Sequence, residues 1–315
     1  MQKLLNQIIC GDCIEVLGKI GEPFADLIFA DPPFNIGYKY DKYYDKVKSK
    51  NYIAWTKEWM SVCKNVLKPH GSFYIAIGDE YAANIKIIAD ELGLHLRNWI
   101  IWHYTFGQQT KNKFARAHTH IFYFINDEKN FTFNEYAVRI PSDRQLIYND
   151  RRANPKGKMP NDVWDEFPRV CGTFKERTGW HPCQMPENLL KRIIAVSSNP
   201  RDCVLDPFCG SGTTAAAAYQ LGRNYVGVEI SEEYVRNANE RLSQLKTQYY
   251  GNLFFNVTEL NQLRQLLSDM KRPIKEITAD KKLLRLFTNQ FAVRMNNRRR
   301  YSSEEVASAL RDLVD

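Results

Sequence analysis

The chain has 315 residues, of which 44% are hydrophobic, and this length predicts one large domain or one domain with an appendage. No apolar run is long enough to cross a bilayer, and the first residues lack the hydrophobic region of a signal peptide. The cysteine count of 7 is odd, so the sequence argues against a membrane protein or a disulfide framework and predicts a cytoplasmic location. The formal net charge of +8 favours a polyanionic partner.

The first predicted strand, over residues 7–10, is followed by Gly11, Asp12 and Cys13. Asp12 therefore lies at a strand tip, where α/β sheets place ligand-binding groups. It is also a suitable N-cap for the helix predicted over residues 14–20. Cys10 and Cys13 have no second pair at matching spacing, and a lone pair such as His118 and His120 is more typical of packing, so the sequence predicts no metal site.

The second predicted strand runs from Asp26 to Asp31 and ends in the sequence Asp31-Pro32-Pro33-Phe34. The two prolines fix φ and remove two N–H donors, so the chain leaves the strand extended and stiff. Asp31 and the two proline carbonyls are acceptors, and Phe34 offers a flat apolar face. This combination predicts a socket for a planar group with an exocyclic amine, such as adenine or cytosine. The alternative is a Pro-rich turn in which Asp31 is a helix cap.

The segment over residues 35–50 has neither helical nor strand periodicity. Its lysines and tyrosines alternate, which suits a mobile surface that contacts phosphates and stacked bases. Lys39, Lys42 and Tyr43 are the candidate DNA contacts here. An ordinary solvated loop is the other interpretation.

The middle of the chain alternates between helical and strand patterns. The elements predicted here are a helix over 51–67, a stop at 68–71, a strand over 72–77, a helix over 80–92, and strands over 98–104 and 119–125. The segment between the last two strands carries Lys111, Lys113 and Arg116 as candidate DNA contacts.

Regular periodicity fades between residues 126 and 180. A long irregular insert in a compact domain usually has a function or is disordered, and its aromatic residues argue against disorder. Its scattered basic side chains predict the surface that selects a DNA sequence, with Arg139, Arg144, Arg151 and Arg152 as contacts.

Regular structure returns with a helix over 187–198, followed by a strand, a glycine turn and a helix. The strand ends at Asp206, and the turn runs through Phe208, Cys209, Gly210, Ser211, Gly212 and Thr213. Glycines let a backbone approach a ligand closely, and a helix N-terminus offers free N–H groups. The next strand ends at Glu229 and Ile230, where a carboxylate usually grips a ribose. Without phosphate-binding residues, this pattern suits a nucleoside cofactor that lacks a diphosphate.

Beyond Tyr249 the chain reads as a polar helical extension with a break at residues 271–273 and a last helix over 303–313. It carries the run Arg298-Arg299-Arg300, with Arg294 just before. Such runs are usually solvated, but beside a surface that binds nucleic acid this one is expected to touch phosphates.

In this order, the motifs resemble those of the β-class DNA amino-methyltransferases, which depend on S-adenosylmethionine and include type II restriction-modification and orphan enzymes. In that class the Asp-Pro-Pro-Phe motif comes first, the target-recognition insert second and the Asp-Pro-Phe-x-Gly-x-Gly motif last. The resemblance spans residues 11–245. It implies an α/β fold with a Rossmann-like, seven-stranded, mostly parallel sheet, one reversed strand and helices on both faces. The expected division is a catalytic domain over 1–248, with the insert at 126–180, and a C-terminal helical extension over 249–315.

The resemblance also assigns roles. The catalytic residues would be Asp31, Pro32, Pro33 and Phe34, and the cofactor-binding residues would be Asp12, Cys13, Asp31, His181, Gln184, Asp206, Phe208, Cys209, Gly210, Ser211, Gly212, Thr213, Glu229 and Ile230. The family usually has lysine where this chain has Met185. His181, Gln184 and the N–H groups of residues 210–213 are then the candidates for holding the methionine carboxylate.

The implied reaction takes place on a base flipped out of double-stranded DNA. Asp31 and the Pro32 carbonyl would accept the two amine hydrogens, Phe34 would stack on the base, and the amine nitrogen would attack the methyl group of the cofactor. Adenine N6 is favoured over cytosine N4 because Asp-Pro-Pro usually accompanies adenine in this family. The alternatives are an RNA base, a protein glutamine, or a non-catalytic DNA-binding protein with the same fold. The resemblance further allows a homodimer, a cognate restriction endonuclease, and a prokaryotic enzyme that is nucleoid-associated while acting.

Overall fold

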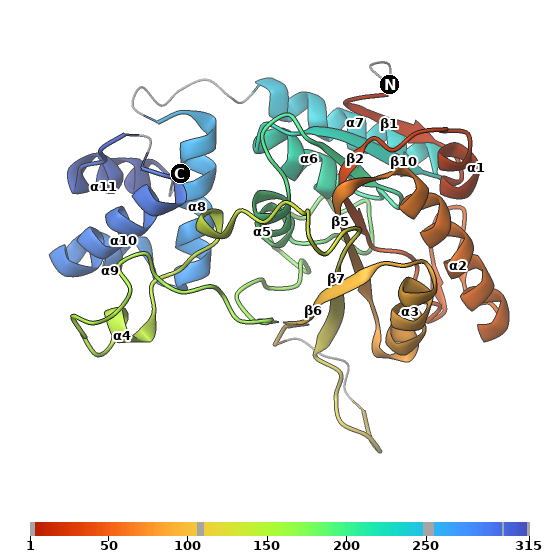
Figure 1. The fold of residues 1–315 in the computed structure, drawn as a ribbon, viewed down its shortest axis with the longest axis horizontal. Coiled ribbons are helices and arrows are strands. Elements are labelled where there is room, and N and C mark those ends of the chain that lie inside the picture. The colour runs from red at the N-terminus through yellow and green to blue at the C-terminus, as the bar shows by residue number, and fades with distance from the viewer. Residues whose placement is uncertain (1–3, 106–109, 248–254, 298, 314–315) are drawn as a thin grey trace.

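The computed structural model describes residues 4–105, 110–247, 255–297 and 299–313. One twisted sheet crosses the larger part of the molecule, with helices on both of its faces, and a group of C-terminal helices lies at one end (Figure 1). The α/β class predicted from the sequence is therefore confirmed.

The sheet has the strand order β1-β10-β9-β2-β5-β7-β6-β8 among the described residues. All pairs are parallel except those of β7, which runs antiparallel to β5 and β6. The strands are β1 (Gln7–Cys10), β2 (Ala25–Ala30), β5 (Leu67–Ile77), β6 (His95–His103), β7 (His118–Ile125), β8 (Val163–Trp164), β9 (Cys203–Asp206) and β10 (Asn224–Glu229).

The prediction of seven strands is wrong by one. The eighth strand, β8, comes from the insert and pairs in parallel with Ile101 and Trp102 of β6. Trp164 of β8 and Phe167 just after it pack into the main core, and the Trp102 indole donates to the Phe167 carbonyl at 2.7 Å. The insert is thus anchored to the sheet by aromatic side chains, although its own sequence has no strand periodicity.

Successive side chains of the central strands alternate between two hydrophobic layers, as a sheet covered on both faces requires. Ile28 and Phe73 face one layer of helices, whereas Leu27 and Tyr74 face the other. The first layer consists of α1 (Cys13–Gly18), α2 (Ser49–Val66) and α3 (Asp79–Glu91), and the second of α5 (Glu187–Ser197), α6 (Thr213–Gln220) and α7 (Glu232–Thr247). Within the described residues, no helix has the length and hydropathy needed to span a membrane.

Residues 35–50, whose pattern predicts neither helix nor strand, do contain regular structure. They form a small hairpin of β3 (Tyr38–Lys39) and β4 (Tyr44–Asp45), and the last two of them begin α2. Asp45 is fully buried, and its carboxylate accepts from the backbone N–H groups of Asn35 at 2.6 Å and Ile36 at 3.2 Å. This carboxylate holds the hairpin against the chain that leaves the Pro-Pro turn.

The remaining short elements of the insert are η1 (Glu135–Ala137) and α4 (Asp143–Leu146). The C-terminal helices are α8 (Val257–Met270), α9 (Ile274–Ala279), α10 (Lys281–Arg294) and α11 (Ser303–Asp312). They enclose a hydrophobic cluster of their own, built around residues such as Leu263, Phe287 and Phe291, against which Leu146 of α4 also packs. The break predicted at residues 271–273 separates α8 from α9.

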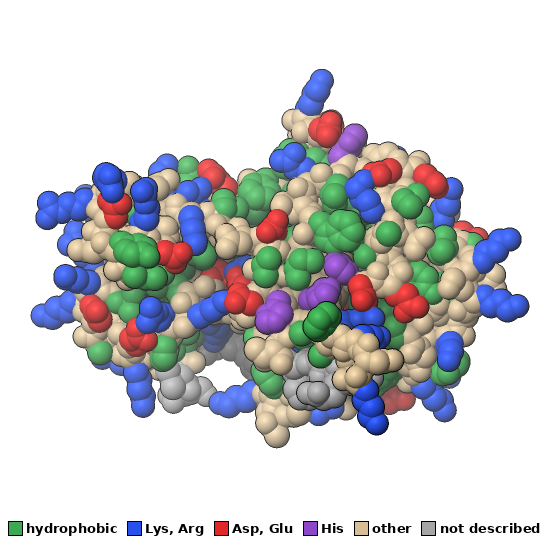
Figure 2. All heavy atoms as spheres, turned by 90° about the horizontal axis from the view of Figure 1, so that it is seen from below, with side chains coloured by type: hydrophobic (Ala, Val, Ile, Leu, Met, Phe, Trp, Pro, Cys, Tyr) green, Lys and Arg blue, Asp and Glu red, His purple; other side chains and the backbone are tan. Residues whose placement is uncertain are grey.

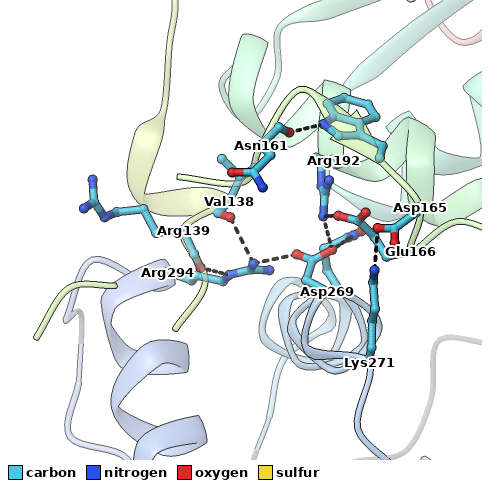
Figure 3. A network of polar contacts seen from close by, with 11 residues as sticks. Val138, Arg139, Asn161, Asp165, Glu166, Arg192, Asp269, Lys271 and Arg294 are labelled. Carbon is cyan, nitrogen blue, oxygen red and sulfur yellow. Dashed lines mark hydrogen bonds and ion pairs between the residues drawn. The ribbon is translucent and has the colours of Figure 1, made fainter. Parts of the chain in front are cut away.

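A buried ionic network joins the C-terminal helices to the rest of the protein (Figure 3). The Asp269 carboxylate of α8 is fully buried between Arg192 of α5, at 2.7 Å, and Arg294 of α10, at 2.5 Å. Arg192 also pairs with Glu166 of the insert, and Nε of Arg294 donates to the Arg139 carbonyl at 2.9 Å. The network therefore connects α5, the insert and the extension.

This network overturns part of the prediction for the arginine-rich extension. Arg294 cannot contact phosphates, because its guanidinium is buried and paired with Asp269. Arg299 pairs with Glu259 at 3.0 Å, whereas Arg298 lies outside the described residues. The sequence of a charge run does not show that Arg294, just before it, pairs with a buried carboxylate on another helix.

Candidate active site

A cavity of about 670 Å³ opens at the edge of the sheet where the central parallel strands end. The register pairs Cys10 with Glu229, and Gly227 with Asp206, so β1, β10 and β9 finish side by side. Strand β2 pairs with β9 through Leu27 and Val204 and leads directly to Asp31. The topology therefore brings the two remote motifs of the sequence to one cavity, and residues of both line its wall.

The Asp31-Pro32-Pro33-Phe34 turn forms one side of the cavity. The Tyr52 hydroxyl of α2 donates to the Pro33 carbonyl at 2.6 Å, so this carbonyl serves the fold and is not the free acceptor that the sequence predicts. Phe34 lies beside Gly78, where an added Cβ would be 3.5 Å from its ring. Asp31 and the Pro32 carbonyl remain as the acceptors of the predicted socket.

The glycine turn between β9 and α6 forms another part of the wall. Gly210 has a φ of +47°, and a Cβ at this position would lie 2.8 Å from Nε2 of His181, so a side chain cannot be accommodated. The Gly210 N–H donates to Glu229 at 2.8 Å, and the Gly212 N–H donates to the Cys209 carbonyl at 2.8 Å. These two N–H groups hold the turn itself, contrary to the prediction that they face the cofactor.

The floor of the cavity is acidic. Desolvation, together with the neighbouring Asp206 charge, raises the pKa of Asp31 to about 8. Desolvation also raises the pKa of Asp206 to about 7, against the hydrogen bonds that it accepts from Thr214 and the Phe208 N–H. Desolvation raises the pKa of Glu229 as well, although this carboxylate accepts from the N–H groups of Ser231 and Gly210. An acidic floor of this kind favours a ligand with a positive charge or with several hydrogen-bond donors.

His181 and Gln184 are the two side chains predicted to bind the methionine carboxylate, and they differ in which of their hydrogen-bonding atoms lack a partner. Burial lowers the pKa of His181 to about 4, so its ring is neutral at pH 7, and its Nδ1 has no hydrogen-bond partner among the described residues. Gln184 is buried, donates to the Glu176 carbonyl at 2.7 Å and accepts from the Thr178 N–H at 2.9 Å. Its amide oxygen and one of its two amide hydrogens hold the loop, so only the second hydrogen is left for a ligand, and the predicted role of Gln184 stays a prediction.

Most of the other predicted cofactor residues lie in the cavity wall. Asp12 lines it and also caps α1, accepting from the Ile14 N–H at 2.8 Å, so the predicted cap is confirmed and the ligand-binding role stays a prediction. Gly212 is not part of the wall; it packs against Ala238 of α7. The predicted residues found in the wall are Asp12, Cys13, Asp31, His181, Gln184, Asp206, Phe208, Cys209, Gly210, Ser211, Thr213, Glu229 and Ile230.

The predicted DNA contacts fall into two groups. Lys42, Tyr43 and Arg116 line the cavity, and the exposed Lys39, Lys111 and Lys113 lie on the two segments that supply these residues. Those of the insert lie at and after α4, where Arg144, Arg151 and Arg152 are exposed. Arg139 differs because it pairs with Glu135 at 2.8 Å and donates to the Lys156 and Gly157 carbonyls, so its guanidinium serves the insert.

Sequence reasoning missed several polar residues of the wall, and two of them illustrate why. Arg169, from the insert, lines the cavity, and its charge acts to lower the pKa of Asp31 against the stronger effect of desolvation. Tyr40, from the small hairpin, also lines the cavity. Neither residue has a signal in its spacing, because each reaches the cavity through an irregular segment.

Comparisons with known proteins point to one family. A family model described as DNA methylase matches residues 25–240. The chain is 39% identical over 238 residues to the type II methyltransferase M.HpaI of Haemophilus parainfluenzae, covering 75% of this chain and 74% of that protein. It is 42% identical over 245 residues to the DNA adenine methyltransferase YhdJ of Escherichia coli (strain K12), covering 75% of this chain and 82% of that protein. The crystal structure of the M1.HpyAVI–SAM complex has the same fold, with a TM-score of 0.52 and 22% identity over 75% of this chain and 99% of that one.

Proposed function

The chain belongs to the DNA methylase family and is a site-specific, S-adenosylmethionine-dependent DNA methyltransferase, and we propose that it methylates N6 of an adenine held outside the duplex at Asp31. The observation that carries this proposal is the convergence of the Asp31–Phe34 turn and the glycine turn on one cavity. The 42% identity to an adenine methyltransferase supports adenine over cytosine.

The residues of the cavity fit the cofactor. Glu229 ends β10 beside the glycine turn, where its carboxylate would hold the ribose hydroxyls. His181 would donate or accept one hydrogen bond through its unpartnered Nδ1. When bound, S-adenosylmethionine supplies a methyl group on a positively charged sulfur, and the acidic floor of Asp31 and Asp206 suits that charge.

The residues of the Asp31–Phe34 turn would act on the base. The ionised Asp31 carboxylate and the Pro32 carbonyl would each accept one amine hydrogen, which localises the nitrogen lone pair that is otherwise delocalised into the ring. The ring of Phe34 would hold the base in place by stacking. The chain thus contributes alignment and electrostatic stabilisation, while removal of the base from the stack costs a few kcal/mol.

The proposal is tested by incubating the enzyme with labelled S-adenosylmethionine and bacterial DNA, RNA or protein. We expect label in DNA alone, and mass spectrometry of the digested nucleosides should identify N6-methyladenine. Sequencing for modified bases then gives the recognition site. N4-methylcytosine as the product would contradict the proposed base, and label found only in RNA or protein would contradict the proposed substrate. The absence of transfer to any substrate would favour a non-catalytic binding protein.

Cofactor binding is expected to release up to about one proton between pH 7 and pH 8. Desolvation and neighbouring carboxylates raise the pKa of Asp31 to about 8 and that of Asp206 to about 7, so the cofactor-free site retains a proton in this range. A bound sulfonium favours both carboxylates and lowers their pKa values. The same raised values mean that the folded state holds more protons than the unfolded one, so these groups reduce stability increasingly as the pH rises toward 8.

Isothermal titration calorimetry in two buffers of different ionisation enthalpy measures this release. S-adenosylhomocysteine, which has a neutral sulfur, is the matched ligand and should release fewer protons. The Asp31→Asn variant should release less than the wild type with either ligand. Binding enthalpies that are equal in both buffers would refute the proposed charge pairing.

Further parts of the proposal concern assembly and location. The domain division is proposed as a catalytic part over 1–248 and an extension over 249–315, which the separate hydrophobic cluster of the C-terminal helices supports. A homodimer, a cognate restriction endonuclease and a place beside the chromosome in the bacterial cytoplasm remain predictions. Gel filtration of the purified enzyme tests the first of these.

A further inference from the structure

Phe114 is a large hydrophobic residue whose side chain is fully exposed. It lies on the loop between β6 and β7, and Figure 1 shows this loop projecting away from the rest of the molecule. A single exposed apolar residue is common on protein surfaces and by itself indicates nothing. Whether the exposure of Phe114 indicates a function depends on where its loop begins and ends.

Both ends of this loop are part of the cavity wall. Trp102 and Tyr104 line the cavity on the β6 side, and Arg116 and His118 line it on the β7 side. A Cβ at Gly78 would lie 3.5 Å from the Phe34 ring and 3.8 Å from Nη1 of Arg116, so the base of the loop lies next to the proposed base-stacking ring. The loop that carries the exposed ring therefore begins and ends in the wall of the cavity where the target base would sit.

The charge around Phe114 fits a nucleic acid. Lys111 and Lys113 precede it and are exposed, and Arg116 follows it, held by Asp79 at 2.7 Å. Figure 2, which views the molecule from the side on which the loop projects, shows further Lys and Arg side chains around the margin of this face. Cations on both sides of an apolar ring suit a ring that enters a base stack between two phosphate backbones.

We propose that Phe114 inserts into the DNA duplex at the target position and fills the space that the flipped base leaves. This role rests on the proposed function, because it needs a base taken out of double-stranded DNA. Apolar side chains that wedge between bases offset the stacking lost when the duplex opens. Phe114 would then favour the open duplex without touching the base that reacts, so it is a positioning residue.

The test uses a duplex that carries the recognition site with 2-aminopurine in place of the target adenine. Its fluorescence rises when the base leaves the stack. For the Phe114→Ala variant we expect a clear loss of this rise and, on the same duplex with adenine at the target, a single-turnover methylation rate about tenfold lower. Phe114→Trp should retain most of both signals. Phe133→Ala is the control for the loss of an aromatic ring elsewhere, because Phe133 is 42% exposed, lies near the end of α5 and is not part of the cavity wall.

A mismatched target distinguishes this role from a structural one. A base without its pairing partner costs less to flip, so the Phe114→Ala enzyme should regain most of its rate on DNA with a mismatch at the target adenine. Equal flipping by Phe114→Ala and the wild type, or a defect that persists on the mismatched duplex, would overturn the proposal. A wild-type enzyme that methylates no DNA would instead overturn the proposed function, and this role with it.

Discussion

Replacing Asp31 by alanine is expected to lower the rate of methyl transfer by about a hundred- to a thousandfold, the effect typical of removing one preorganised group that stabilises a transition state. The carboxylate lies in the cavity wall beside Pro32 and is the acceptor best placed to polarise the target amine. Since Glu229 and the glycine turn would hold most of the cofactor, its affinity should change by no more than about tenfold.

The rate is measured in single turnover with labelled cofactor, and affinity is measured separately by calorimetry. Asp31→Asn keeps the shape of the side chain and guards against misfolding, but its amide presents donors to the amine hydrogens, so a large loss is expected here too. Asp127→Ala is the matched control, because Asp127 is exposed and its carboxylate accepts from the Lys129 N–H in a surface turn. Near-normal activity of both Asp31 variants would end the catalytic assignment.

The position of the site could be predicted from the sequence because it depends on strand ends. Asp12, Asp31, Asp206 and Glu229 each follow or end a short apolar run, and parallel strands bring such ends to one edge of a sheet. The order of the motifs then indicated the family and its fold. Helix and strand positions followed from periodicity, with differences of a few residues at their boundaries.

The hydrogen-bond partners of individual side chains could not be predicted in the same way. Gln184 and the Pro33 carbonyl look free in the sequence, but a loop backbone and the Tyr52 hydroxyl occupy them. Arg169 reaches the cavity through an irregular insert whose path has no periodic signal. Such contacts depend on segments far apart in the chain, and a motif does not encode them.

The strand β8 and the burial of Arg294 were missed for a related reason. Two residues are too few for a strand pattern, and a charged residue is predicted to be exposed unless its partner is known. The partner of Arg294 is Asp269, on a neighbouring helix of the extension. Asp269 also pairs with Arg192 of α5, which is 77 residues away in the sequence. The extension is therefore an integral part of the fold, although the DNA methylase family model ends at residue 240.

Replacing Asp269 by alanine is expected to lower the free energy of unfolding by about 3–5 kcal/mol, which is typical when one partner of a buried ion pair is removed. Two buried guanidinium groups, those of Arg192 and Arg294, would lose their shared carboxylate, and Glu166 would remain as a partner for Arg192 alone. Burial by itself would raise the pKa of Asp269, but the two arginines hold it below its ordinary value. This contribution is therefore present at neutral pH and is lost as the pH falls below about 4.

Urea unfolding followed by circular dichroism at pH 7 measures the change, and the difference between variant and wild type should shrink in acid. Asp165→Ala is the matched control, because Asp165 pairs with Lys271 in the same region but on the surface, where a pair contributes about 1 kcal/mol at most. An Asp269→Ala protein as stable as the control would show that the network does not hold the extension in place. Glu166, Val138 and Arg139 of the insert contact the same network. Relative to the wild type, the Asp269→Ala variant should therefore lose more affinity for DNA than for the cofactor.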